Sequence, residues 1–325
     1  MDCKITPATL EELKNFRKTA PRLNWFSPFI LPEWLDVWQR VFGNDFNPYI
    51  RIISQNNEAI GVAPLMLKDK TAYFLGNIDV CDYQDFIVAS GKEEDFLAAL
   101  LDDLKQNGIK ELDLKHVRPD SVTLKKLVPL AEKRGYKVAV EQQDVSFEME
   151  LPASFEEYLS SLTTKQRHEV RRKMRRLNEE GNIVYRVING GVELPGALET
   201  FYKMFVESRH DKAEFLTDQM KQYFDLLTKA MADIELLKIG VLELDGKPIA
   251  SIMYFDYNDC IYLYNSGYDP QYVGLSSGLL SKVYAINDAI EKGKRRFDFL
   301  KGAEVYKGHL GGKEVPMYRC QIGIA

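Results

Sequence analysis

The chain has 325 residues, of which 45% are hydrophobic and 28% are charged, and its formal net charge is −5. This length favours two domains of ordinary size, and the composition is typical of a soluble globular protein. The negative charge argues against a general nucleic-acid binder, so we expect no DNA partner. No apolar run approaches the roughly 18 residues that span a bilayer, and no export signal is visible, so we expect a cytoplasmic protein without a transmembrane segment.

Several familiar catalytic motifs are missing from the sequence. It has no HExxH motif and no Walker phosphate loop, which argues against a metalloprotease and a P-loop NTPase. The cysteines form no CxxC pair and match no zinc spacing; they are Cys3, Cys81, Cys260 and Cys320. We therefore expect reduced thiols and no metal site.

The first half of the chain alternates predicted helices with predicted strands. A helix is predicted over 31–43, because Pro32 suits a first turn and Gly43 a helix end. Its Trp34 and Trp38 share one face, and either pack in the core or form an aromatic wall of a substrate cleft. The following predictions are strands at 49–54, 59–67, 71–75 and 84–89, a helix at 93–107, a strand at 110–115, a helix at 120–134 and a strand at 136–150. This alternation indicates an α/β layered domain.

A domain boundary is predicted at Pro152, which gives domains of 1–151 and 152–325. The helix predicted next, over 154–181, contains an unusually basic part at 163–180. Its stretch KQRHEVRRKMRR holds seven Lys or Arg residues and one Glu. The basic face is either a solvated surface or a patch for a nucleotide, a nucleotide-linked sugar or a tRNA acceptor arm. An apolar stripe on the same helix is formed by Val170, Met174 and Leu177.

The second half is expected to continue with mixed elements. They are a strand at 183–188, helices at 193–211 and 217–231, strands at 236–244, 247–256 and 260–265, a helix at 277–292, a strand at 296–300 and a last strand near 317–324. The dipeptide Asp245-Gly246 predicts a hairpin turn, and Gly293 predicts the end of a helix.

The same pattern occurs twice in the chain. The matching segments are EAIGVA at 58–63 with GKPIAS at 246–251, and GIKELDL at 108–114 with GKRRFDF at 293–299. The offset is 189 residues from Ile60 to Ile249 and 185 residues from Asp113 to Asp298. A period this long is not that of a solenoid and predicts two copies of one α/β domain.

Between the matching segments the copies differ: the second carries NSGYDP at 265–270, GLSSG at 274–278 and KGAEVYKG at 301–308, whereas the first has NIDVCDYQDFIV at 77–88 and no glycine-serine turn. A glycine- and serine-containing turn at a helix start exposes backbone N–H groups that suit a pyrophosphate or another anion. Gly274 and Gly278 permit close approach, and Ser276 and Ser277 either donate hydroxyl groups or cap the helix.

These motifs resemble those of the GNAT acyltransferases, most closely the CelD-type acetyltransferase group, which is related to the FemABX peptidoglycan aminoacyltransferases. The resemblance rests on KQRHEVRR, YNSGYDP and DFLKGAEVYK and covers most of 30–320. It implies an α/β fold of two tandem GNAT-like domains, each a mixed, mostly antiparallel sheet flanked by helices, with a degenerate first copy. The chain departs from the family's R/Q-x-x-G-x-G/A loop, because Ser276 stands at the second small position.

The resemblance also implies roles for individual residues. A strand N–H just after Tyr264 would polarise the acyl carbonyl, Tyr264 would line the cleft, and Tyr306 would donate to the leaving group. Asp298 would be the base or hold the amine, although its place in both copies equally suits a cap of the following loop. Lys301 and Lys307 would bind phosphate or carboxylate groups, with Lys307 close to the chemistry. The residues expected to bind the acceptor are Asp82, Tyr83, Asp85, Arg167, Arg171 and Ser266. The first three follow a DYxD pattern of the family, and we expect them on the acceptor side of a cleft between domains.

The expected activity is therefore N-acyl transfer. We expect acetyl-CoA or another acyl-CoA as co-substrate, no permanently bound cofactor, and an amine acceptor on a sugar, a cell-envelope precursor or a similar polar molecule. Two alternatives stay open: an aminoacyl-tRNA donor, which the basic helix suggests, and a non-catalytic binding module.

Overall fold

The computed structural model describes residues 3–76, 79–208 and 214–324, and the chain forms two compact units. Unit 1 comprises 1–145 and 315–325, and unit 2 comprises 146–314. Along the sequence, unit 2 therefore begins six residues before Pro152. The last strand was predicted to lie in the second domain, but most of it belongs to unit 1. The reason is strand β7 (Lys137–Glu150), which is continuous across the break, so that Pro152 marks the end of a strand instead.

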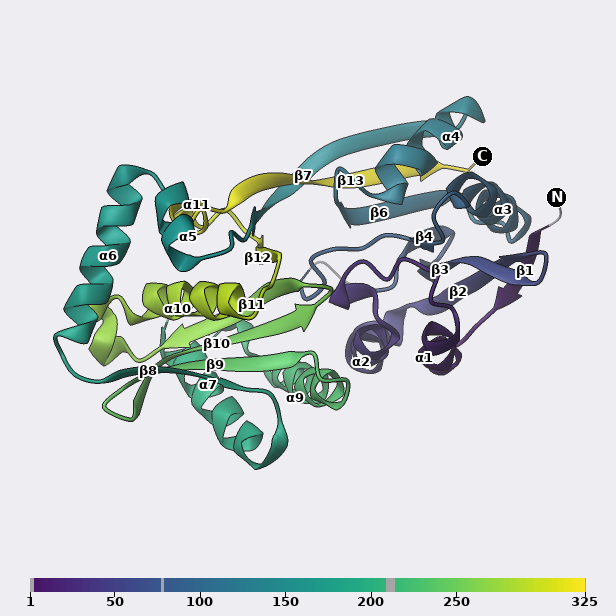
Figure 1. Ribbon diagram of the computed structural model, residues 1–325. Coiled ribbons are helices and arrows are strands. Elements are labelled where there is room, and N and C mark those ends of the chain that lie inside the picture. Colours follow the sequence, from purple (N-terminus) through teal and green to yellow (C-terminus); the bar gives the residue numbers. More distant parts are fainter. Residues whose placement is uncertain (1–2, 77–78, 209–213, 325) are drawn as a thin grey trace. The chain divides into compact units, whose positions relative to one another are not determined.

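Unit 1 is a mixed sheet flanked by helices (Figure 1). Its strand order is β1 (Cys3–Pro7), β2 (Asn47–Gln55), β3 (Glu58–Lys68), β4 (Thr71–Phe74), β6 (Glu111–Val117) and β13 (Lys313–Gly323), with the short β5 (Ile87–Val88) beside β3. The helices are α1 (Leu10–Thr19), α2 (Pro32–Phe42), α3 (Glu93–Gln106) and α4 (Val128–Lys133). Among the strand pairs described for this unit, β4 with β6 is parallel, and β1–β2, β2–β3, β3–β4, β3–β5 and β6–β13 are antiparallel.

Unit 2 repeats this layout. Its strand order is β8 (Ile183–Ile188), β9 (Leu237–Leu244), β10 (Lys247–Tyr257), β11 (Cys260–Tyr268), β12 (Arg296–Lys301) and the end of β7. The helices are α5 (Phe155–Ser161), α6 (Thr164–Asn178), α7 (Leu194–Ser208), α9 (Asp218–Asp233), α10 (Ser277–Glu291) and α11 (Val305–His309). Of the strand pairs that the structure describes here, β11 with β12 is parallel and the other four are antiparallel, and a helix connects β11 to β12.

The strand orders of the two units correspond one to one, which confirms the duplication predicted from the sequence. Each copy also has a hairpin turn with two residues of positive φ. These are Asn56 and Asn57 (φ 53° and 63°) in the first copy, and Asp245 and Gly246 (φ 50° and 75°) in the second. Such a pair of left-handed residues gives the turn a twist that matches the flanking strands.

Four sequence predictions differ from the structure. The helix predicted over 154–181 is divided into α5 and α6, because Leu162 is extended and Thr163 starts a new helix with a capping box to Gln166. The strand predicted over 84–89 is reduced to β5, and β11 is longer than predicted, so that part of SGYDP is strand. Strand β1 and helix α1 were not predicted. The end of the helix predicted over 193–211 lies outside the described residues.

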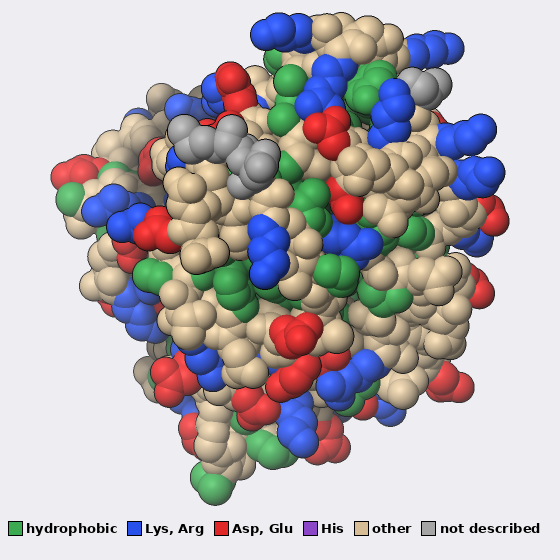
Figure 2. Space-filling model, turned by 90° about the vertical axis from the view of Figure 1, so that its right-hand side faces the viewer, with side chains coloured by type: hydrophobic (Ala, Val, Ile, Leu, Met, Phe, Trp, Pro, Cys, Tyr) green, Lys and Arg blue, Asp and Glu red, His purple; other side chains and the backbone are tan. Residues whose placement is uncertain are grey.

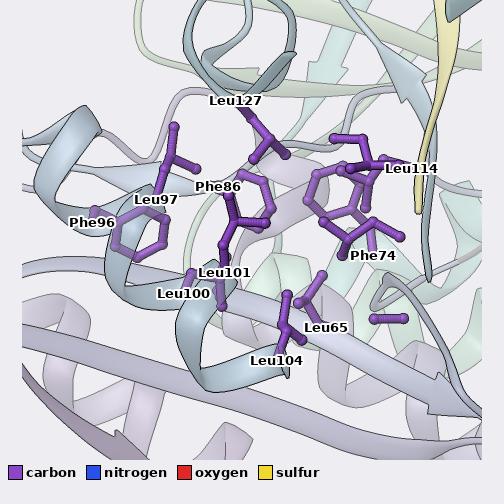
Figure 3. Close-up of a cluster of buried hydrophobic side chains, with 14 of the residues drawn as sticks. Leu65, Phe74, Phe86, Phe96, Leu97, Leu100, Leu101, Leu104, Leu114 and Leu127 are labelled. Carbon is purple, nitrogen blue, oxygen red and sulfur yellow. The ribbon is translucent and has the colours of Figure 1, made fainter. Parts of the chain in front are cut away.

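Each unit has its own hydrophobic core. In unit 1 the buried face of α3 packs on the sheet, and Figure 3 shows its leucines beside side chains of β3, β4 and β6. Trp34 and Trp38 are 0% and 1% exposed, so they are core residues and form no open aromatic wall. In unit 2 the core includes the predicted stripe of α6, with Val170 and Leu177 buried and Met174 packed against them. Complete burial of a side chain of this size contributes about 1.5–3 kcal/mol.

The surface and the cysteines agree with the composition. Figure 2 shows one face of the molecule, where acidic and basic side chains are interspersed. Within the described chain none of the four cysteines forms a disulfide, and three of them are buried. Among the described helices none is long and apolar enough to cross a membrane. The described side chains also contain no cluster of three or more His, Cys, Asp or Glu residues that would hold a metal ion.

Candidate functional site

The parallel pairing of β11 with β12 ends early. Cys260, Ile261 and Tyr262 pair with Arg296, Phe297 and Asp298, and β11 then continues to Tyr268 with β10 as its only strand neighbour in the described chain. Tyr264 is an extra residue in this part, because Leu263 pairs with Tyr254 and Asn265 with Met253. From this β-bulge onward, residues 263–268 pair with β10 and no longer with β12. We call residues 263–268 the open edge of β11.

Side chains of the open edge point to two different sides of the sheet. Ser266 and Tyr268 face α10, which Figure 1 shows alongside β10 and β11. Tyr264 points the other way and makes edge-to-face contacts with Phe224 of α9 and Phe255 of β10. The structure therefore places Ser266 beside α10 and packs Tyr264 on the α9 side, so that the two do not share one surface.

The glycines of both motifs allow close packing around this edge. A Cβ atom on Gly267 would lie 2.4 Å from backbone atoms of Met204 and Phe205, so α7 can pass β11 only at a glycine. A Cβ atom on Gly278 would lie 2.7 Å from the ring of Tyr268. The SGYDP and GLSSG motifs thus fit α7, β11 and α10 together.

The start of α10 provides open backbone donors. Ser276 precedes the helix in a left-handed conformation (φ 59°) and makes no side-chain capping bond. The N–H groups of Leu279 and Leu280 bond to the carbonyl of Ser276, but within the described chain those of Ser277 and Gly278 have no partner. Together with the helix dipole, two such donors favour an anion.

The basic helix α6 reaches the same place. The ammonium group of Lys173 donates a 3.0 Å hydrogen bond to the hydroxyl of Ser276. Ser277 is buried, and its hydroxyl donates to the carbonyl of Tyr272 at 3.4 Å, while Gly274 is exposed. The sequence prediction missed Lys173 as an individual residue, although it recognised the basic helix that carries it.

A second lysine was missed altogether. Lys282 of α10 is 6% exposed, and its ammonium group donates to the hydroxyl of Ser266 at 3.0 Å and to the carbonyl of Gly278 at 2.7 Å. The same group lies 5.2 Å from the ring centre of Tyr306. The available signal was a lone lysine on a helix that is otherwise apolar in this part, one turn after the GLSSG motif.

The closing loop uses Lys307 as a structural anchor. The ammonium group of this 2% exposed residue donates to the carbonyls of Leu300, Lys301 and Gly302 at 3.0, 2.6 and 3.1 Å. It also forms an ion pair of 2.9 Å with Glu304. These contacts hold the loop after β12, and they give no support to the expected role of Lys307 in the chemistry. The side chain of Lys301 is half-buried at the end of β12.

Asp298 lies at the last pair of the β11–β12 ladder. It is 1% exposed, and its carboxylate accepts the backbone N–H of Leu300 at 2.8 Å. Leu300 has a positive φ of 63°, so this bond holds a strained bulge, as the capping alternative supposed. The carboxylate is on the side of Cys260, where burial and, after it, the negative charge of Asp298 raise the pKa of the thiol to about 12. That side is opposite to Ser266, because the bulge at Tyr264 shifts the alternation: Tyr262 pairs with Phe255, whereas Ser266 pairs with Ile252, which faces the other way.

The expected acceptor residues of unit 1 are buried. Asp85 accepts the backbone N–H groups of Val122 and Thr123 at 2.6 and 3.1 Å and the Thr123 hydroxyl at 2.7 Å, so it caps a helical segment. Burial raises the pKa of Asp85 to about 6 in spite of these bonds. Tyr83 is 2% exposed and lies under the guanidinium group of Arg118, and Asp82 is 9% exposed.

The basic residues of α6 fall into two groups. Arg171 pairs with Glu156 at 2.6 Å, Arg172 pairs with Glu169 at 2.8 Å, and Arg167 donates to the carbonyl of Ser160 at 3.4 Å. The bond from Arg172 lowers the pKa of Glu169 to about 2. In contrast, three exposed residues have no partner within the described chain; they are Lys165, Arg175 and Arg176.

Comparisons with known proteins agree with this geometry. Residues 164–308 match the family model of the acetyltransferase (GNAT) domain, which includes α6, β11, α10 and β12. A search of curated proteins finds no match. Among solved structures, the chain is similar to FemX, with 13% identity, a TM-score of 0.65, and coverage of 97% of this chain and 96% of that one.

Two further structures have the same fold over nearly their full length. One is the C-terminal domain of a putative lysylphosphatidylglycerol synthetase from Agrobacterium fabrum, with 10% identity, a TM-score of 0.60, and coverage of 97% of this chain and 92% of that one. The other is a conserved protein of unknown function from Bacteroides thetaiotaomicron, with 11% identity, a TM-score of 0.61, and coverage of 99% and 100%. Residues 164–308 are therefore similar to the acetyltransferase (GNAT) domain, and the chain as a whole has the fold of FemX.

Proposed function

We propose that unit 2 transfers an acyl group from a CoA thioester to an amine of a polar acceptor, such as a sugar or a cell-envelope precursor. The observation that carries this proposal is the open edge of β11 beside the uncapped start of α10. One feature would offer a strand backbone N–H group to an acyl carbonyl, and the other would offer helix N–H groups to a pyrophosphate.

The proposed donor site begins at α10. The N–H groups of Ser277 and Gly278 would bind the pyrophosphate, and Lys173 with the Ser276 hydroxyl would add a positive charge and a polar group beside it. The acyl end would then lie along residues 263–268, where a strand N–H stabilises the oxyanion. Gly274 and Lys301 would contact the rest of the donor.

The proposed chemistry uses both sides of the sheet. The amine nitrogen forms a bond to the acyl carbon, the C–S bond breaks, and the proton that the amine loses balances the one that the thiolate gains. On the α10 side, Tyr306 would give a proton to the thiolate, near Ser266. On the opposite side, Asp298 would hold the amine or accept its proton. In unit 2, Tyr264, Arg167 and Arg171 remain candidates for binding the acceptor, whereas Asp82 and Tyr83 of unit 1 are buried.

Mass spectrometry tests the proposal. The chain is incubated with acetyl-CoA and longer acyl-CoA donors and a panel of amino sugars and other polar amines, and we expect an acylated amine together with free CoA. No product and no binding with any acyl-CoA would remove the CoA version. Turnover with any acyl donor would remove the third possibility, a non-catalytic binding module.

A second candidate donor is an aminoacyl-tRNA, and the exposed basic residues of α6 favour it. Lys165, Arg175 and Arg176 point to solvent without partners in the described chain, and each phosphate that they neutralise would make binding depend on salt. Charge reversal at Arg175 and Arg176 is expected to weaken tRNA binding and to flatten its salt dependence. Unchanged tRNA affinity in that double variant would exclude this donor.

A further inference from the structure

Lys282 connects three elements that surround the open edge of β11. It contacts β11 through the hydroxyl of Ser266 and the first turn of α10 through the carbonyl of Gly278. It contacts α11 through the ring of Tyr306. Because the ladder between β11 and β12 ends at Tyr262 and Asp298, strand pairing no longer sets the distance between these elements. The ammonium group of Lys282 connects them at this point.

Burial of a lysine at this point is not explained by stability. Lysine is almost never fully buried, and transfer of an ammonium group out of water is costly unless every bond is replaced. An apolar side chain of similar volume at a buried charged position is often neutral or stabilising. One turn after Lys282, the buried positions of α10 are apolar, with Ala285 and Ile286 3% and 0% exposed. Methionine would fill the same volume without the desolvation.

Lys307 shows what a purely structural buried lysine does in this fold. Its bonds run to three consecutive carbonyls and one carboxylate of a single loop. Lys282 instead donates to a side-chain hydroxyl on one element and lies over an aromatic ring on another. Both of these partners are groups with polar hydrogens that can take part in acyl transfer.

We propose that Lys282 is a positioning residue for the acyl end of the site. It holds the Ser266 hydroxyl and the Tyr306 phenol in fixed places at the open edge of β11, and it ties both to the first turn of α10, where the donor phosphates would bind. The catalytic part of this inference rests on the proposed acyl transfer, whereas the positioning of Tyr306 does not.

Substitution kinetics test the catalytic part. In Lys282→Met we expect kcat to fall about 100-fold, the loss typical of reacting groups displaced by about 1 Å, with little change in the KM for acetyl-CoA. Lys282→Arg keeps the charge and should restore at least a tenth of the wild-type kcat. The control is Lys294→Met, because Lys294 is another partly buried lysine of unit 2, paired with Asp256 at 2.6 Å, and its loss should leave kcat unchanged.

Two kinetic results would overturn the catalytic part. One is a kcat of Lys282→Met within about threefold of wild type. The other is a melting temperature that falls in proportion to kcat in both Lys282 variants, because loss of a residue with a purely structural role would lower both quantities together.

A ligand-free experiment tests the positioning of Tyr306. With 3-fluorotyrosine incorporated only at position 306, Lys282→Met should shift or broaden the ¹⁹F resonance, and Lys294→Met should not. An unchanged resonance in Lys282→Met would overturn the inference whether or not the protein is active. If the wild type transfers no acyl group, the proposed function fails, and the ¹⁹F result still decides whether Lys282 positions Tyr306.

Discussion

Two substitutions of Asp298 separate its capping bond from its proposed role as a base. Asparagine keeps an oxygen that accepts the N–H of Leu300, whereas alanine leaves this N–H unsatisfied, and Leu300 is 2% exposed. An unsatisfied buried donor costs about 1–3 kcal/mol, and the positive φ of Leu300 loses the bond that holds it. We expect Asp298→Ala to lose about 2–3 kcal/mol of local stability and Asp298→Asn less than about 1 kcal/mol.

Hydrogen exchange is the suitable assay. All three tryptophans, Trp25, Trp34 and Trp38, lie in unit 1, so their fluorescence does not follow unit 2. Amide exchange in β12 should become about 30- to 100-fold faster in Asp298→Ala, since each 1.4 kcal/mol is a factor of ten. Turnover of Asp298→Asn should fall about 100-fold, because an amide cannot accept the proton.

Different results refute different steps. Unchanged exchange in Asp298→Ala would show that the carboxylate does not hold the bulge. Wild-type turnover in Asp298→Asn, with β12 still protected, would remove Asp298 as the base and leave it a structural residue.

Three further substitutions test the packing and the electrostatics. Asp85→Asn removes a group whose pKa is about 6 in the folded chain and 3.8 when unfolded, so the folded chain holds an extra proton between these values. The free energy of unfolding of the wild type, relative to that of Asp85→Asn, should therefore fall by about 2–3 kcal/mol between pH 4 and pH 7. Urea unfolding followed by tryptophan fluorescence measures it, and parallel pH profiles of the two proteins would contradict the prediction. Gly267→Ala should cost about 3 kcal/mol in unit 2, seen as faster exchange in α7, because backbone atoms lie 2.4 Å from the new Cβ; wild-type protection there would contradict it. Lys307→Met should speed exchange of residues 300–304 by leaving three carbonyls without their donor, and it should leave α10 protected.

The fold was largely predictable because its signals are local. The alternation of helices with strands and the turn at Asp245-Gly246 depend on residues that are close in sequence. The long period between Ile60 and Ile249 is found by direct comparison of two segments. The break at Thr163 was missed, because a continuous basic pattern hides a capping box. The short β5 and the unpredicted β1 depend on pairing with distant strands, which propensity does not reveal.

The site was less predictable because residue type does not reveal what a side chain already binds. Lys307 and Asp85 are polar residues within motifs, yet their groups are committed to backbone partners. Lys282 and Lys173 matter through contacts with Ser266 and Ser276 on other elements, and those contacts exist only in the folded chain. The closer kinship with the CelD-type group and the identity of the donor stay predictions.

The central claim is that the start of α10 and the open edge of β11 bind an acyl-CoA. Calorimetric titration of the whole chain with acetyl-CoA tests it most directly, with Lys173→Met as the paired variant. We predict saturable binding to one site and about tenfold weaker binding in Lys173→Met, since a hydrogen bond from a charged group contributes about 1.5–3 kcal/mol and part of it is recovered by water. No binding of acetyl-CoA or of any longer acyl-CoA, or equal affinity in the two proteins, would contradict the account.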